Sequence, residues 1–147
     1  MLPRLILVLI CAACVAATAC QEYTSGLEKS VVATDDTAAL AALKAIALAE
    51  RSYNITNSGE YGTLQQLTQA NLLDKRFTTN KPVKDYVFTL NVIAKAPGGA
   101  DGSYTCNVDR EPTAVPPGGK HFYVDSTSSD IHVNANQAAT AADPILQ

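Results

Sequence analysis

Residues 1–19 place the strongest constraint on this chain, because they join one positive charge to a long apolar run. Arg4 precedes an uninterrupted apolar stretch from Leu5 to Val15, and small residues close the segment at Ala17-Thr18-Ala19. A charged region, an apolar region and a small-residue cleavage site form the plan of a secretory signal peptide. The apolar run is shorter than the roughly 20 residues that a helix needs to cross a bilayer. We therefore predict that residues 1–19 are an export signal, cleaved between Ala19 and Cys20.

Cys20 stands directly after the small residues. The sequence Ala17-Thr18-Ala19-Cys20 resembles a bacterial lipobox, although Ala17 occupies a position where such sequences usually carry Leu. This resemblance implies that Cys20 is lipidated, becomes the new N-terminus and attaches the chain to a membrane. The same triplet also satisfies the A-x-A rule for ordinary cleavage, which would release a secreted protein with a free Cys20. Lipidation at Cys20 is our prediction, and secretion without a lipid is the alternative.

The chain has four cysteines, and three of them lie near its N-terminus. Cys11 and Cys14 have C-x-x-C spacing, but they lie in the predicted signal peptide and are removed with it, which excludes a redox or metal role for the pair. If Cys20 carries a lipid, Cys106 has no cysteine partner in the mature chain. If Cys20 is not lipidated, a Cys20–Cys106 disulfide is possible in an oxidising envelope.

Composition and motifs exclude several classes of function. A formal charge of −3, from 14 acidic and 11 basic side chains spread along the chain, gives no basic patch for nucleic acid or for an anionic membrane surface. The sequence contains no nucleophile elbow, phosphate loop, H-E-x-x-H motif or EF-hand loop. We predict a non-enzymatic protein without catalytic residues, bound metal or cofactor.

The region after Cys20 reads as a tether followed by a helix. Residues 20–34 are mostly polar, and Asp35-Asp36 can cap a helix N-terminus, so we predict a helix from Thr37 to about Tyr53. Alternatively, Ser25-x-x-Glu28 fits a capping box that would extend this helix backwards. The apolar positions of the helix form one stripe, whereas Lys44 and Arg51 lie off it. The stripe consists of Ala39, Leu43, Ile46 and Tyr53. Thr63-Leu64-Gln65-Gln66 is a further capping box that opens a short helix.

Beyond Pro82 the apolar residues alternate, which predicts strands. Two successive strands each place alternate residues on one face: Tyr86, Phe88, Leu90 and Val92 on the first, and Tyr104, Cys106 and Val108 on the second. In a last hairpin with its loop at 126–129, we expect Phe122 to pair with Val133 and Tyr123 with His132. The Ala-rich helix can cover the apolar face of these strands. The predicted fold is α+β, with an N-terminal amphipathic helix on a roughly four-stranded antiparallel sheet and a polar C-terminal tail.

Several segments of residues 35–147 occur in an order that resembles the globular half of type IV pilins and type II secretion pseudopilins. They are the helix run 35–53 with its A-E-x-x-Y end, Gly59-Glu60-Tyr61-Gly62-Thr63-Leu64-x-x-Leu67, Leu72-Leu73-Asp74, Asp85-Tyr86-Val87-Phe88, Gly102-Ser103-Tyr104-Thr105-x-Asn107, Lys120-His121-Phe122-Tyr123-Val124-Asp125 and Ala142-Asp143-Pro144. The resemblance implies a pilin-like head that acts through contacts with a pilus or secretion apparatus.

The chain departs from pilins at its N-terminal side. Pilins have a leader that ends in Gly, then Phe and about twenty apolar residues, whereas here Gly26 is followed by Leu27-Glu28-Lys29-Ser30. We therefore expect a lipoprotein of the cell envelope rather than an ordinary filament subunit. In this interpretation residues 1–19 are the signal, residues 20–34 the lipidated Cys and tether, and residues 35–147 the head. The lipid would hold it on the periplasmic side of the outer membrane or at the cell surface.

The remaining candidates for chemistry are two histidines and one cysteine. His121 and His132 are diagonal neighbours on the predicted hairpin, with Asp125 and Asp130 at its tip, a pattern that could suggest a metal site. We interpret them instead as solvated strand histidines, because two imidazoles without a third positioned ligand make a poor site. Cys106 beside a histidine could suggest a catalytic dyad, but its place on the apolar face predicts a buried structural thiol.

Overall fold

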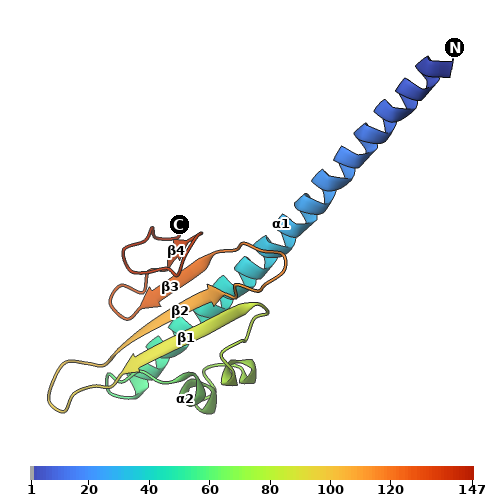
Figure 1. Ribbon diagram of the computed structural model, residues 1–147. Coiled ribbons are helices and arrows are strands. Elements are labelled where there is room, and N and C mark those ends of the chain that lie inside the picture. Colours follow the sequence, from blue (N-terminus) through green and yellow to red (C-terminus); the bar gives the residue numbers. More distant parts are fainter. Residues whose placement is uncertain (1) are drawn as a thin grey trace.

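The computed structural model describes the backbone of residues 2–147 and the side chains of residues 25–147 (Figure 1). Its elements are α1 (Leu2–Thr56), α2 (Leu64–Gln69), the 3₁₀ helix η1 (Lys75–Thr78), β1 (Tyr86–Ile93), β2 (Ser103–Arg110), β3 (His121–Asp125) and β4 (His132–Asn134). The strands form one antiparallel sheet in the order β1-β2-β3-β4. The predicted α+β class, with a helix and a four-stranded antiparallel sheet, is confirmed.

Helix α1 does not begin at Asp35-Asp36, so the predicted N-cap is wrong. Residues 25–34 are helical, as the alternative of a backward extension required. This segment contains no Pro, and its only Gly is Gly26. It therefore has almost no residue that disfavours a helix, and α1 continues through it. In Figure 1 this part of α1 runs beyond the sheet, and every side chain from Ser25 to Val31 is exposed. The two aspartates lie inside the helix and are free to make contacts with the sheet.

The core lies between one face of the sheet and one stripe of α1. The helix contributes small and branched residues that let it approach closely: Ala39, Ala42, Leu43, Ile46 and Ala49. The sheet contributes alternate residues of its strands: Tyr86, Phe88, Tyr104, Cys106, Val108, Phe122 and Val124. The predicted helix stripe and strand faces are confirmed, except that Tyr53, Leu90 and Val92 are only partly buried. At roughly 25 cal/mol per Å² of apolar area, this contact is the main stabilising term of the domain.

The segment between α1 and the sheet closes one end of the core. Ser58 and Gly59 have positive φ angles of 56° and 89° and end the helical run. Thr63 then caps α2 in the predicted capping box, because its side chain accepts a hydrogen bond from the Gln66 N–H and the Gln66 side chain accepts one from the Thr63 N–H. Leu67 and Phe77 are buried on the core.

The last hairpin has the predicted register, with Phe122 opposite Val133 and Tyr123 opposite His132. The C-terminal tail is not a free polar segment. The Val133 N–H donates to the Pro144 carbonyl, and the Leu146 N–H donates to the Ile131 carbonyl, so the tail pairs with the outer edge of β4. A sheet edge is covered in this way. Within the described residues, no helix carries a stretch long and apolar enough for a membrane span.

Candidate interaction site between α1 and the loop before β3

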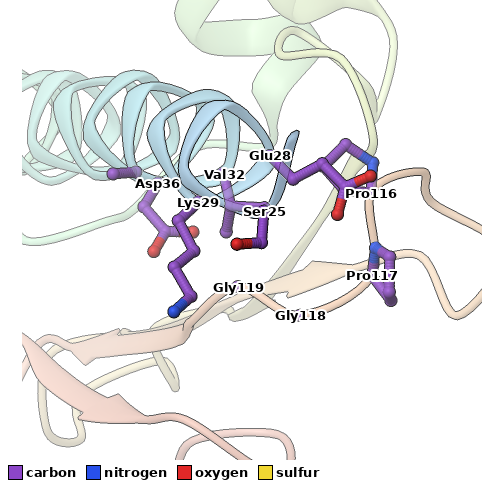
Figure 2. Close-up of a pocket in the computed structure, with 10 residues that line it drawn as sticks. Ser25, Glu28, Lys29, Val32, Asp36, Pro116, Pro117, Gly118 and Gly119 are labelled. Carbon is purple, nitrogen blue, oxygen red and sulfur yellow. The ribbon is translucent and has the colours of Figure 1, made fainter. Parts of the chain in front are cut away.

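A groove of about 430 Å³ separates the first described turns of α1 from the loop that joins β2 to β3. Figure 2 shows Ser25, Lys29, Val32 and Asp36 leaving one face of α1 toward this loop. Their spacing of three or four residues puts them on the same side of the helix. The opposite wall consists of Pro116, Pro117, Gly118 and Gly119. We call this space the α1 groove.

The loop wall approaches the helix closely because it contains two glycines with positive φ. Gly118 has φ +96° and Gly119 has φ +112°. A Cβ atom at Gly119 would lie 2.5 Å from Arg110 Cδ and 3.2 Å from Asp36 Oδ1, whereas at Gly118 it would meet open space. Glycine is therefore needed at position 119 for both its conformation and its contact distance.

Asp36 lines the α1 groove and connects α1 to β1 and to the end of the loop before β3. Its Oδ1 accepts a hydrogen bond from the Lys120 N–H at 3.1 Å, and the hydroxyl of Tyr86 also donates to it. Burial of the ring, followed by the hydrogen bond to Asp36, raises the pKa of the Tyr86 hydroxyl well above its ordinary value. Tyr86 is therefore a neutral donor, and Asp36 fixes the helix against the sheet rather than acting as a free carboxylate.

Arg110 lies beneath the same loop with only 3% of its side chain exposed. Its guanidinium is 3.7 Å from Asp35 Oδ2 and 4.0 Å from Asp85 Oδ2, and Nη2 donates to the Pro116 carbonyl at 3.1 Å. It also lies over the Tyr86 ring, 5.6 Å from the centroid. Buried charges persist in a folded domain when they are paired, and here the pairing joins helix, strand and loop. We call Asp35, Asp36, Asp85, Tyr86 and Arg110 the junction cluster.

A second space of about 330 Å³ adjoins the α1 groove, and Pro117, Gly118 and Gly119 line both. Arg110 and His121 lie on its wall. The His121 ring is held by Asp109, with Nδ1 2.8 Å from Oδ1. The loop with Gly118 and Gly119 therefore separates two hollows.

The residues of the suggested metal site do not form a ligand cluster, although His121 and His132 are diagonal neighbours across β3 and β4. His132 is only 8% exposed, so the expectation that both histidines are solvated is wrong for this one. The C-terminal tail covers it, and its Nδ1 lies 2.6 Å from the Asp143 carbonyl oxygen. Asp125 instead accepts hydrogen bonds from the Thr127 N–H and the Tyr123 hydroxyl. Among residues 25–147 no group of three His, Cys, Asp or Glu side chains is arranged to hold a metal ion.

Cys106 is a free and fully buried thiol in the core, as predicted. Burial raises its pKa to about 12, so the thiol stays protonated at neutral pH and is a poor nucleophile. Cys20 and Ala19, the predicted lipidation and cleavage positions, lie outside the residues whose side chains the structure describes.

The sequence-based predictions missed the structural roles of three charged residues. Arg110 continues the buried alternation of Tyr104, Cys106 and Val108, which is the signal that could have placed it inside. Glu50 follows Leu43 by seven positions and Ile46 by four, and is likewise on the buried stripe. Asp35 received a capping role because local sequence gives no indication of Arg110.

Comparison of the chain with known protein families, curated proteins and solved structures finds no match in any of the three.

Proposed function

We propose that this chain is a non-enzymatic lipoprotein of the bacterial cell envelope, whose α+β domain is a pilin-like interaction module accessory to a type IV pilus or secretion system. The observation that carries the proposal is the continuous helix through residues 25–56. A helix rises 1.5 Å per residue, so the turns before Asp35 hold the head about 15 Å beyond Ser25. A head on a helical stalk keeps a defined orientation, which a flexible tether would not give.

The exposed surface of the stalk supports a role in binding. Leu27 is 51% exposed and Val31 is 45% exposed, and their spacing of four residues puts them on one side of α1. The α1 groove occupies a different face of the same turns. Exposed apolar side chains and grooves both occur in protein contact surfaces. The stalk therefore offers two surfaces, on roughly opposite sides of α1, to partners in the envelope.

Metabolic labelling with a palmitate analogue tests the proposed anchor. We expect label in the wild-type chain produced in a bacterial host, and loss of label in Cys20→Ala. Cys14→Ala is the matched control, because this cysteine lies in the predicted signal peptide, and it should keep the label. An unlabelled wild-type chain recovered from the medium would replace the proposal with the alternative of a secreted, non-lipidated adhesive or binding domain.

The partner is tested separately by photo-crosslinking in cells that assemble a type IV pilus or type II secretion system. A crosslinking amino acid at Val31 should yield an adduct with a component of that apparatus, and the same group at exposed Thr89 on β1 should not. Adducts from both positions, or from neither, would argue against a partner bound by the stalk.

A further inference from the structure

Glu50 is a buried acid at the other end of the head, about 20 Å along α1 from Asp36 at 1.5 Å per residue. Its side chain has no exposed surface. Oε2 accepts a hydrogen bond from the Gly62 N–H at 2.9 Å, and Oε1 has no hydrogen-bond partner in the described part of the chain. Glu50 thus holds the loop of residues 57–63 through one backbone bond.

The surroundings of Glu50 contain no compensating positive charge. Its ionisable neighbours are Tyr61 on the loop and Tyr104 and Cys106 on β2, and its negative charge raises the pKa of all three. Among residues 25–147, no Lys, Arg or His forms an ion pair with it. Burial raises the pKa of Glu50 to about 7, although the Gly62 hydrogen bond acts in the opposite direction. An ionised carboxylate in this position is costly unless water reaches it.

The loop that Glu50 holds also binds the sheet and the β1–β2 connection. The Tyr61 ring packs on the Tyr104 ring with centroids 5.0 Å apart. The carbonyl of Gly59 accepts from the Gly102 N–H at 3.1 Å, and that of Ser58 accepts from Lys95 Nζ at 2.9 Å. A hollow of about 210 Å³ beside Tyr61 and Tyr104 provides room for water next to these rings. Movement of the loop would therefore expose Tyr104 and free the β1–β2 connection together.

We propose that Glu50 is a pH-sensitive latch: loss of its proton to water loosens residues 57–63 from the sheet and uncovers Tyr104. The protonated carboxyl group fits the uncharged interior and keeps the loop closed. The ionised group is stabilised by water, which it reaches when the loop opens. The head then has a closed form below neutral pH and a more open form above it.

Hydrogen exchange of the full-length chain, followed residue by residue at pH 5.5 and pH 8, tests the latch. Protection factors, which correct for the intrinsic pH dependence of exchange, should fall at least tenfold at pH 8 for amides of residues 57–63. The Val108 amide in the central strand β2 should stay well protected at pH 8, because its exchange requires unfolding of the whole domain. Equal protection of the loop at the two pH values would overturn the proposal.

Two variants assign the effect to one carboxyl group. Glu50→Gln should keep the loop protected at both pH values, and Glu60→Gln, which removes an exposed acid from the same loop, should behave as wild type. A fall in protection that persists in Glu50→Gln overturns the proposal. If Glu50→Gln does not fold, the titration of the wild-type Glu50 carboxyl, followed by its ¹³C signal, tests the latch instead. A titration midpoint near neutrality that coincides with the loss of loop protection supports the latch. A midpoint below pH 5 contradicts it.

Discussion

The hydroxyl of Tyr86 donates a hydrogen bond to Asp36, although 50 positions separate the two residues in the sequence. Tyr86 opens β1 and Asp36 lies in α1, so the bond ties the first strand to the helix where the stalk leaves the head. The Lys120 N–H donates to the same oxygen. One carboxylate therefore fixes the helix to a strand and to the loop before β3.

Replacement of Tyr86 by Phe removes this donor while keeping the buried ring. We expect a loss of about 1–2 kcal/mol in the free energy of unfolding, because a hydrogen bond to a charged acceptor is lost. Urea denaturation measures the change. Tyr53→Phe is the control, since the Tyr53 hydroxyl makes no hydrogen bond within the described part of the chain, and a comparable loss in both variants would deny Asp36 this role.

Replacement of Arg110 by Met removes the buried cation of the junction cluster. Asp35 and Asp85 then lose their shared positive partner, and removing one member of a buried ionic group typically costs about 3–5 kcal/mol. Lys84→Met deletes an ion pair to the same Asp85 from a side chain that is 74% exposed, and it should cost less than about 1 kcal/mol. Similar midpoints for the two variants in thermal unfolding would contradict the importance of Arg110.

The two loop glycines should differ in their tolerance of alanine. Both variants meet the strain of a positive φ, roughly 1 kcal/mol. Only Gly119→Ala also places a Cβ 2.5 Å from Arg110 Cδ, whereas Gly118→Ala meets nothing within 4 Å. We therefore expect Gly119→Ala to be the more destabilising by at least about 1 kcal/mol in urea denaturation. The reverse order would show that the loop does not pack on the junction cluster as described.

Stability should fall as pH rises through the range in which Glu50 ionises. Its pKa is raised from 4.5 to about 7 by burial, so the folded chain binds this proton more tightly than the unfolded chain does. The contribution of the protonated group is complete below pH 4.5, declines between pH 4.5 and 7, and is lost above pH 7. At 1.36 kcal/mol per pKa unit the decline amounts to about 3 kcal/mol. Urea denaturation across this range should show the decline in wild type and not in Glu50→Gln, and parallel curves would refute the assignment to Glu50.

Local patterns predict much of this fold because its strands alternate cleanly. Phe122 and Val124 face the core and Tyr123 does not, so the register of the last hairpin follows from the sequence. The capping box at Thr63 is equally local, since all of its partners lie within three residues.

The candidate site was harder to predict because its contacts join distant segments. Asp35-Asp36 looks like a helix cap until Arg110 and Tyr86 are known to lie opposite. His132 looks solvent-exposed until the tail returns to cover it, with Asp143 eleven positions later. The local sequence around these residues does not indicate either arrangement. A polar side chain in an alternating pattern is predicted to be exposed, and this prediction fails when a distant segment packs over it.

We propose that the mature chain begins at a lipidated Cys20 and displays its head on the α1 stalk. Intact-mass spectrometry of the protein extracted from the membrane fraction of a bacterial host measures both features of this N-terminus, its first residue and its lipid. We expect a chain that starts at Cys20 and carries the added mass of a diacylglyceryl group, with or without a further acyl chain, located to Cys20 by fragmentation. A chain that starts at Cys20 without added mass, or one that retains residues 1–19, would contradict lipidation at Cys20.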